Sequence, residues 1–265
     1  FKFIDANDKL SIQVHPGDEY AGRFENSLGK TEAWYVVHAE KGAKLICGLA
    51  KPLTRSDIEN GIKSNTLEKL LREFEVKAGD CFFVPAGTVH AIESGLIIYE
   101  VQQVSDITYR LYDWGRVDEK GNPRDLHIEK SLEVMNFNDI ENHKTEPVVM
   151  NEAWGKREII TACEYFILYK DFITGVNTLN TNGKFKVITL LSGEVNIEYN
   201  DGTETLKQGE TALLPAVIPE YRLKPADNNS VVLVTDIPAN KEQVISELSA
   251  LGITQEQMKK LGGLL

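Results

Sequence analysis

The sequence contains few cysteines and no long apolar segment, and both absences narrow the class of protein. The three cysteines, Cys47, Cys81 and Cys163, are widely spaced and form no CxxC pair. This favours buried free thiols in a reducing cytoplasm over a disulfide framework. No apolar run approaches the roughly 18 residues that a membrane-spanning helix needs, and no signal-peptide pattern is present. We therefore expect a cytoplasmic protein that does not cross a membrane.

Positive charge is also scarce. The chain carries 29 Lys and Arg residues against 40 Asp and Glu residues, which gives a net charge of −11 and a pI near 5.0. This balance argues against non-specific binding to nucleic acid or to anionic membranes. A protein of this charge that handles an anionic ligand must concentrate its positive charge locally, in a pocket.

The chain begins without a methionine, at Phe1, inside a segment that already has the pattern of a strand. We therefore expect the native N-terminus to lie upstream of this residue. With 265 residues, of which 42% are hydrophobic, the chain is long enough for one large or two ordinary domains.

Most segments are short and rich in β-branched and aromatic residues, with Gly, Pro, Asn or Asp between them. This pattern predicts a mainly β fold of the sandwich or barrel type. Besides the first segment and those that carry the candidate ligands below, the predicted strands are residues 33–37, 44–49, 81–84, 96–101, 108–112, 165–172, 185–191, 195–199, 211–214 and 231–235.

Two regions have a helical pattern instead. Within residues 53–74, apolar residues from Leu67 to Phe74 recur at helical spacing, and Asn65 followed by Glu68 predicts a capping box at the start. We expect a helical insert there, in the first β domain. Residues 239–265 contain two further cap spacings, which predict short C-terminal helices: Asn240 with Gln243, and Thr254 with Gln257.

A weak internal repeat relates residues 79–90 to residues 209–220. In both segments a Gly is followed six residues later by Pro and Ala, but the position of His90 in the first becomes Glu220 in the second. The repeat predicts two β domains of similar design, with polar chemistry in the first and no metal in the second. The polar, irregular region 137–151 is the expected link between them.

Four polar residues of the first half form a candidate metal site. Gln13 and His15 lie two apart and would share one face of a strand, and Glu32 stands in a similar strand with Lys30 two residues before it. His90 follows a Pro-Ala-Gly turn. An amide oxygen, two imidazoles and one carboxylate suit Zn²⁺ or a similar ion, and they leave the centre net positive and Lewis acidic.

The phrase G-x₅-P-x-G-x₂-H at residues 79–90, with a His and a Glu upstream, resembles the two motifs of the cupin superfamily. Gln13 stands where the first His of that motif usually lies. Four phrases together resemble type I mannose-6-phosphate isomerase in its short bacterial form: residues 10–16 (LSIQVHP), 29–35 (GKTEAWY), 85–90 (PAGTVH) and 109–116 (YRLYDWGR). The resemblance covers residues 1–236 and is strongest up to residue 116.

The resemblance implies two cupin-type β-barrels (jelly rolls), a single zinc ion bound by Gln13, His15, Glu32 and His90, and the interconversion of mannose 6-phosphate and fructose 6-phosphate through a cis-enediol. The expected domains are residues 1–145 (catalytic, with the insert at 53–74), 146–238 (a second, metal-free barrel) and 239–265 (C-terminal helices). The expected partner is a small sugar phosphate; the sequence leaves the oligomeric state open.

The same resemblance implies roles near the ion. Arg110 would stabilise enediolate charge and orient the substrate, with Asp106, four residues earlier, as its acidic partner; residues i and i+4 of a strand would share a face. Lys30 is a candidate proton relay or hydroxyl binder. Ser11 and Lys2 are candidates for phosphate binding. The base stays open between a metal-bound water, Lys30, Asp106 and Glu100.

One further departure from the family pattern and two alternative functions remain. Ile92 stands where larger family members have a Tyr, so one hydroxyl is absent here. His38, His127 and His143 have no motif context, and we expect structural roles for them. A cupin dioxygenase with redox-active iron, and a non-catalytic sugar-binding cupin, are the competing functions; Gln13, Lys30 and Arg110 favour an anionic sugar substrate over oxygen chemistry.

Overall fold

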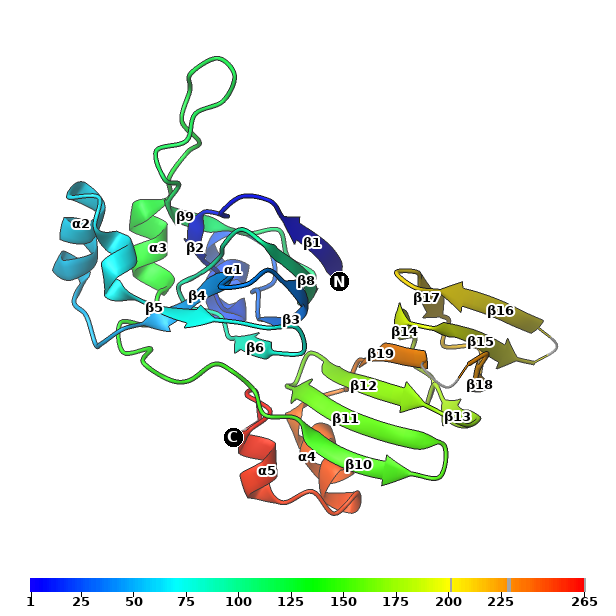
Figure 1. Cartoon of the computed structure of the whole chain (residues 1–265). Helices are drawn as coiled ribbons and strands as arrows, with labels where there is room; N and C mark the ends of the chain where they lie inside the picture. The colour runs from blue at the N-terminus through cyan, green and yellow to red at the C-terminus, as the bar shows by residue number, and fades with distance from the viewer. Residues whose placement is uncertain (201, 228–229, 265) are drawn as a thin grey trace. The chain divides into compact units, whose positions relative to one another are not determined.

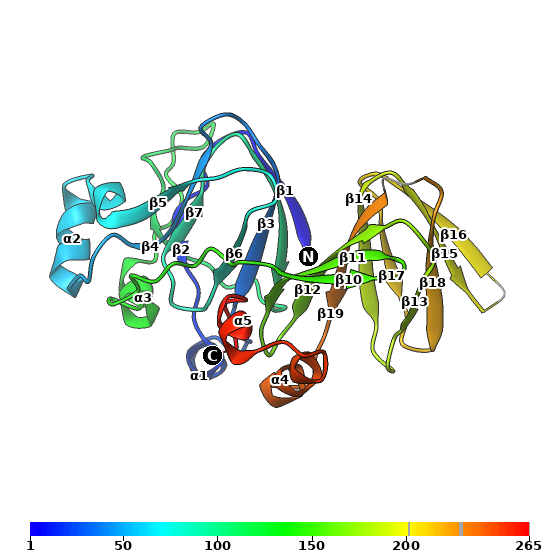
Figure 2. The same ribbon diagram turned by 60° about the horizontal axis from the view of Figure 1, so that its bottom comes forward.

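The structure is a computed structural model that describes residues 1–200, 202–227 and 230–264. It is mainly β, as predicted, and its strands pair in antiparallel fashion. The chain divides into two compact units, residues 1–144 and 145–265. Figures 1 and 2 show each unit as curved sheets with short helices beside them. Within the described residues, no helix is both long and apolar enough to span a bilayer.

The first unit contains two sheets, and its helices are short. Its elements are β1 (Lys2–Ala6), β2 (Ile12–Val14), α1 (Asp18–Phe24), β3 (Glu32–Ala39), β4 (Lys44–Leu49), α2 (Arg55–Lys63), η1 (Leu67–Leu70), β5 (Leu71–Glu75), β6 (Cys81–Val84), β7 (His90–Ile92), β8 (Leu96–Gln102), β9 (Tyr109–Tyr112) and α3 (Ile128–Val134). One sheet has the order β1-β8-β3-β6 and the other β5-β4-β7-β2-β9. The strands predicted for this half are confirmed to within a few residues.

The core of this unit follows from the strand sequences. In β2, Ile12 and Val14 are buried in one apolar cluster, while Gln13 between them faces the other side. In β3, Trp34 and Val36 are buried in a second cluster together with Phe82 of β6. The polar side chains of the site therefore lie on strands that apolar neighbours hold in place on both sides.

The predicted helix over the second part of the insert is wrong. The helix is α2, and its capping box is formed by Thr54 and Asp57 instead of Asn65 and Glu68. Asn65 has a φ of 54°, a left-handed conformation that ends a helix, whereas an N-cap residue is extended. The chain then forms the short turn η1 and enters β5, where Phe74 pairs with Leu45 of β4, so the backbone groups find their partners in a sheet.

The second unit also contains two sheets, followed by two helices. Its elements are β10 (Val148–Glu152), β11 (Gly155–Ala162), β12 (Ile167–Ile173), β13 (Asn177–Asn180), β14 (Lys186–Ser192), β15 (Glu194–Tyr199), β16 (Gly202–Lys207), β17 (Thr211–Leu214), β18 (Glu220–Pro225), β19 (Ser230–Asp236), α4 (Lys241–Ala250) and α5 (Gln255–Lys259). The sheet orders are β10-β11-β12-β19-β14-β17 and β13-β18-β15-β16. The expected irregular link ends earlier than predicted, because β10 begins at Val148 and pairs with β11.

The C-terminal helices begin at the predicted caps. Asn240 accepts a hydrogen bond from the backbone N–H of Gln243, and Thr254 forms a capping box with Gln257. Their apolar side chains are buried with those of β10, β11 and β12. These helices therefore complete the core of the second unit; residue 265, the last of the predicted tail, lies outside the described residues.

The internal repeat is present in the structure. Gly79 and Gly209 both have positive φ, at 95° and 84°. Strands β6 and β17 begin two residues later at equivalent positions, and β7 and β18 begin at His90 and Glu220. The two units therefore share this turn–strand–turn–strand segment, and His90 marks the point where their chemistry differs.

Candidate metal and substrate site

The predicted metal ligands come together in the first unit. Gln13 lies directly opposite His90 in the pairing of β2 with β7. Glu32 is the first residue of β3, and His15 directly follows β2. His15, Glu32 and His90 are buried, and each offers one ligand atom within 4.8 Å of the others.

The two imidazoles are held so that their free nitrogens point to a common centre. His15 Nδ1 lies 2.7 Å from the carbonyl oxygen of Ile107, and His90 Nδ1 lies 2.8 Å from that of Thr88. Because a carbonyl only accepts, each Nδ1 carries the proton and each Nε2 presents a lone pair. Carbonyl partners of this kind fix the tautomer of metal-binding histidines.

No proton lies between the inward-facing nitrogen of His15 and the carboxylate of Glu32. His15 Nε2 has no hydrogen-bond partner among the described residues, and it lies 3.4 Å from Glu32 Oε1. A lone pair facing a carboxylate oxygen in a buried site is unfavourable unless a cation lies between them. The arrangement therefore fits a divalent ion.

Gln13 completes the donor set. Its amide nitrogen lies 3.3 Å from His90 Nε2, and its amide oxygen lies 3.4 Å from Ser11 Oγ. A half-turn of the amide exchanges oxygen and nitrogen, so the oxygen can face the same centre as the imidazoles. Two imidazoles, one carboxylate and one amide oxygen are compatible with a zinc-type ion.

The electrostatics of the group favour the forms that bind metal. Burial raises the pKa of Glu32, but the neighbouring His15, His90 and Lys30 outweigh burial and hold this pKa below its ordinary value. Lys30 Nζ lies 2.6 Å from Glu32 Oε1. Burial and the charge of His15 lower the pKa of His90 to about 3. The carboxylate is thus ionised and the imidazole neutral at physiological pH.

A cavity of about 660 Å³ opens beside this group. Gln13, Ser11 and Arg110 are part of its wall, and Arg110 lies opposite Gln13 in the pairing of β2 with β9. His90, Gln13 and Arg110 therefore stand in one row across three neighbouring strands. The remaining wall consists of Asp5, Ala6, Asn7, Asp8, Lys9, Leu10, Asp106, Thr108, Arg116, Arg124 and His127.

The predicted pairing of Arg110 with Asp106 is wrong. Strand β9 begins at Tyr109, so Asp106 does not share a strand face with Arg110 but lies on the preceding loop and is exposed. Arg110 instead donates from Nε to Ser11 Oγ at 3.2 Å and from Nη1 to the carbonyl of Asp125 at 3.0 Å. Asp106 and Arg110 still face the same cavity.

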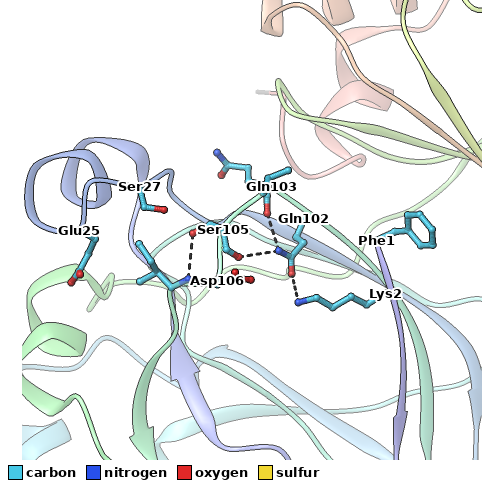
Figure 3. A pocket seen from close by; sticks show the side chains of 10 residues that line it. Phe1, Lys2, Glu25, Ser27, Gln102, Gln103, Ser105 and Asp106 are labelled. Atoms are coloured by element: carbon cyan, nitrogen blue, oxygen red, sulfur yellow. Dashed lines mark hydrogen bonds between the residues drawn. The ribbon is translucent and has the colours of Figure 1, made fainter. Parts of the chain in front are cut away.

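Lys2 lies at a second cavity, of about 490 Å³, which shares Asp106 with the first (Figure 3). Its ammonium donates to the side-chain oxygen of Gln102 at 2.8 Å and lies 3.5 Å from Glu100. The two residues predicted to bind phosphate, Ser11 and Lys2, are therefore found at different cavities.

Glu100, one of the predicted base candidates, is linked to the metal group through Trp34. The indole N–H of Trp34 donates to Glu32 Oε2 at 3.1 Å and to Glu100 Oε2 at 3.2 Å. Burial, followed by the charge of Glu32, raises the pKa of Glu100. Two carboxyl groups with pKa values shifted in opposite directions therefore share one indole donor.

Several residues of the site escaped the sequence analysis. Arg124 lines the first cavity, but it stands in a polar loop with no periodicity that would have marked it. His127, expected to be structural, also lines it, and its Nδ1 accepts from the backbone N–H of Arg110 at 3.3 Å. Of the other two histidines, His38 is exposed on β3, and His143 is paired with Asp139 at 2.7 Å.

The fold and site define the chain as a cupin-type β protein whose buried His-Glu-His group fits a metal ion. A family model described as "Mannose-6-phosphate isomerase, cupin domain" matches residues 156–229. The chain is 39% identical to mannose-6-phosphate isomerase ManA of Bacillus subtilis over 224 residues, which is 84% of this chain and 70% of that protein. It is 36% identical to mannose-6-phosphate isomerase of Streptococcus mutans over 83% of this chain and 69% of that protein. The chain belongs to the type I mannose-6-phosphate isomerase family.

Solved structures agree with this assignment. The crystal structure of mannose 6-phosphate isomerase from Bacillus subtilis matches with a TM-score of 0.81 and 33% identity, over 89% of this chain and 74% of that one. A phosphomannose isomerase variant from Salmonella typhimurium matches with a TM-score of 0.67 at 13% identity, over 89% of this chain and 78% of that one. The second likeness shows the fold alone.

Proposed function

We propose that this chain is a metal-dependent aldose–ketose isomerase that interconverts mannose 6-phosphate and fructose 6-phosphate through a cis-enediol. The observation that carries the proposal is the buried group of His15, Glu32 and His90, whose ligand atoms face one centre beside a cavity with a cationic wall. Relatives that carry the name mannose-6-phosphate isomerase support the choice of substrate.

The proposed ligands are Gln13, His15, Glu32 and His90, and the proposed ion is Zn²⁺. When bound, such an ion would polarise a substrate oxygen as a Lewis acid. The ligand set suits zinc because imidazole nitrogens and an amide oxygen bind as neutral ligands and Glu32 is the one anionic ligand, so the centre keeps a net positive charge.

The chain's own side chains would bind the sugar and move the proton. The reaction transfers one proton between C2 and C1, so negative charge develops on the oxygens of the enediolate. We assign the stabilisation of this charge to Arg110, which lies in the same strand row as Gln13 and His90. Lys30, held against Glu32, would bind a hydroxyl or relay the proton, and Asp106 faces the cavity as a further proton carrier.

Phosphate recognition is proposed for the cationic side of the site. Ser11 supports this role best, because its hydroxyl lies 3.2 Å from Arg110 Nε at the larger cavity. Lys2 is retained as a candidate at the neighbouring cavity. Hydroxyl and guanidinium donors side by side are the usual partners of a phosphate group.

We further propose that the two units are two cupin barrels: a catalytic one (residues 1–145) with the insert at 53–74, and a metal-free one (residues 146–238), followed by the helices from residue 239. Two antiparallel sheets in each unit and the shared turn–strand segment support this proposal. Residues 201 and 228–229 of the second barrel lie outside the described part of the chain.

Three buried free thiols support a cytoplasmic location.

A coupled assay that consumes fructose 6-phosphate tests this function. Zinc-loaded protein should convert mannose 6-phosphate, lose activity with a chelator and regain it with zinc. A parallel measurement of oxygen uptake by iron-loaded protein tests the dioxygenase alternative. Oxygen consumption without sugar isomerisation would contradict the isomerase assignment and support the dioxygenase. Binding of mannose 6-phosphate without turnover would support a sugar-binding cupin.

A further inference from the structure

The turn that follows β9, residues 113–116, is held in an unusual conformation. Trp114 and Gly115 both have positive φ, at 59° and 68°. A bulky residue adopts this left-handed conformation only where its surroundings enforce it. Here the Trp114 indole donates to the carbonyl of Leu10 at 2.9 Å, and the Lys9 ammonium lies 4.6 Å from the centroid of its ring. The turn is thus fastened to the chain segment that enters β2.

Asp113 stands at the start of this turn and joins two arginines. It is buried, with 5% of its side chain exposed. Its Oδ2 accepts from Arg124 Nε at 2.7 Å, and its Oδ1 accepts from Nη2 of both Arg124 and Arg116. Arg116 also donates to the carbonyl of Lys9. One buried carboxylate therefore holds two guanidinium groups that line the larger cavity.

Three guanidinium groups of this wall are set against one buried carboxylate, that of Asp113. Arg116 also lies 3.6 Å from the exposed carboxylate of Asp8, whereas Arg110 forms no ion pair among the residues that the structure describes. Burial, followed by the charge of Arg124, lowers the pKa of Arg110. The acidic side chains of the same wall, Asp5, Asp8 and Asp106, are exposed, so solvent and salt screen them.

The segment between β9 and α3 is a long loop that extends away from the sheets in Figure 1. Its base is closed by a bridge between Val117 and Pro123 and by the bidentate pair of Asp113 with Arg124. Arg124 sits on this loop with 49% of its side chain exposed even when paired, and without the pair it would populate many rotamers that do not reach the cavity.

We propose that Asp113 is a positioning residue that fixes Arg124 and Arg116 in the wall of the substrate cavity, and that Arg124 is a specificity-determining residue for a doubly charged phosphate monoester. This inference rests on the proposed function, because it takes the substrate to be a sugar phosphate. Asp113 engages Nε and Nη2 of Arg124, so the Nη1 edge is left for the ligand. Holding the arginine in advance removes the rotamer entropy that binding would otherwise cost.

The test compares Asp113→Asn, Arg124→Gln and Arg124→Lys with the parent protein in the zinc-loaded state. KM for mannose 6-phosphate should rise at least about tenfold in Asp113→Asn and Arg124→Gln while kcat changes less than about threefold, because charge-assisted contacts to the phosphate are lost before and during reaction alike. The affinity for inorganic phosphate, measured by calorimetry, should fall in parallel. Arg124→Lys should recover part of the phosphate affinity but not all of it, since lysine lacks the fork geometry.

A matched control is Asp171→Asn in the second unit, where the buried Asp171 likewise forms a bidentate pair with an arginine, Arg157. This control should lower the melting temperature without changing KM or phosphate affinity. If Asp113→Asn does not fold, the Arg124→Gln variant, which removes a half-exposed side chain, still tests the proposal. Unchanged KM and unchanged phosphate affinity in Arg124→Gln would overturn the proposal. Absence of turnover in the parent would overturn the isomerase assignment instead, and calorimetry with inorganic phosphate would still decide the role of the Asp113 pair.

Discussion

At the scale of single residues, the site depends on the partners of its donors as much as on the donors. The carbonyls of Ile107 and Thr88 fix the tautomers of His15 and His90, and Ile107 is a loop residue that no sequence motif marks. Lys30 and Trp34 both bind Glu32. The motif thus specifies which residues are ligands, whereas the structure shows what makes their lone pairs available.

The ligand role of His90 gives a direct prediction. His90→Asn removes an inward-facing lone pair, and zinc affinity should fall by more than about tenfold, since even loss of a ligand's supporting partner costs that much. The matched control is His38→Asn, because His38 is exposed on β3, and its zinc affinity should equal that of the parent. Competition with a chromogenic chelator measures both. Equal zinc affinity in His90→Asn and the parent would remove His90 from the site.

Asp113 predicts a pH dependence of stability. Burial raises its pKa, but hydrogen bonds from Arg124 and Arg116 outweigh burial and hold the pKa below the ordinary value of 3.8. A carboxylate whose pKa is lower in the folded state stabilises the fold above its unfolded pKa, and this contribution is lost as pH falls through the folded pKa. Asp113→Asn should therefore cost about 2 kcal/mol at pH 7, and the difference from the parent should shrink below about pH 4.

Urea unfolding at a series of pH values measures this difference. The Asp171→Asn protein is a poor control here, because burial raises the pKa of Asp171 despite its bond to Arg157, and the two variants should differ in their acid behaviour. A constant difference between Asp113→Asn and the parent from pH 7 to pH 3 would contradict the assigned ion pair.

At the scale of elements, the insert depends on its helix cap. Thr54 Oγ1 accepts from the backbone N–H of Asp57, and the Asp57 carboxylate accepts from the backbone N–H of Thr54. Thr54→Ala removes half of this box and should destabilise the protein by about 1 kcal/mol. Ser56→Ala, two residues further on in the first turn of the same helix and exposed, is the control and should change stability little. Chemical unfolding of both variants checks the difference.

Gly48 in β4 should not tolerate a side chain. Its φ is 83°, and a Cβ there would lie 3.0 Å from the carbonyl oxygen of Asp139 and 3.4 Å from the ring of His143. Gly42→Ala is the matched control, since its φ is 78° and a Cβ would meet nothing within 4 Å. The free energy of unfolding of the control should fall by about 1 kcal/mol from backbone strain alone, and that of Gly48→Ala should fall by clearly more. Equal losses would show that this contact with the segment 139–143 is not close.

The sequence predicted part of the strands, because alternating and fully apolar runs, such as that of β6, are local signals; it missed others, β10, β11, β13, β16 and β18 among them. It failed at residues 65–74, where the spacing of Leu67, Leu70, Leu71 and Phe74 satisfies a helix and a turn-plus-strand equally. Pairing with β4 decided the outcome, and such a pairing is not visible in local spacing. The caps at Asn240 and Thr254 were predicted correctly because capping is itself local.

At the scale of the whole molecule, two units of related design carry different chemistry. The repeated segment places His90 at the start of β7 and Glu220 at the start of β18, and Glu220 is exposed. The metal ligands were predictable because they belong to motifs, whereas the cationic wall was not: Lys9 comes from the loop before β2, and Arg116 and Arg124 come from the loop after β9, and only the fold brings these two loops together. A chain with a net charge of −11 thus concentrates positive charge at one cavity.

The central claim is that one ion, bound by Gln13, His15, Glu32 and His90, supports sugar-phosphate isomerisation. Its most direct test is a zinc titration of metal-free protein, with the conversion of mannose 6-phosphate followed at each addition. Activity should rise linearly and level off at one zinc per chain, while Glu32→Ala should stay inactive and Glu75→Ala, an exposed control on β5, should follow the parent. Full activity of the metal-free chain, or of Glu32→Ala, would contradict the account.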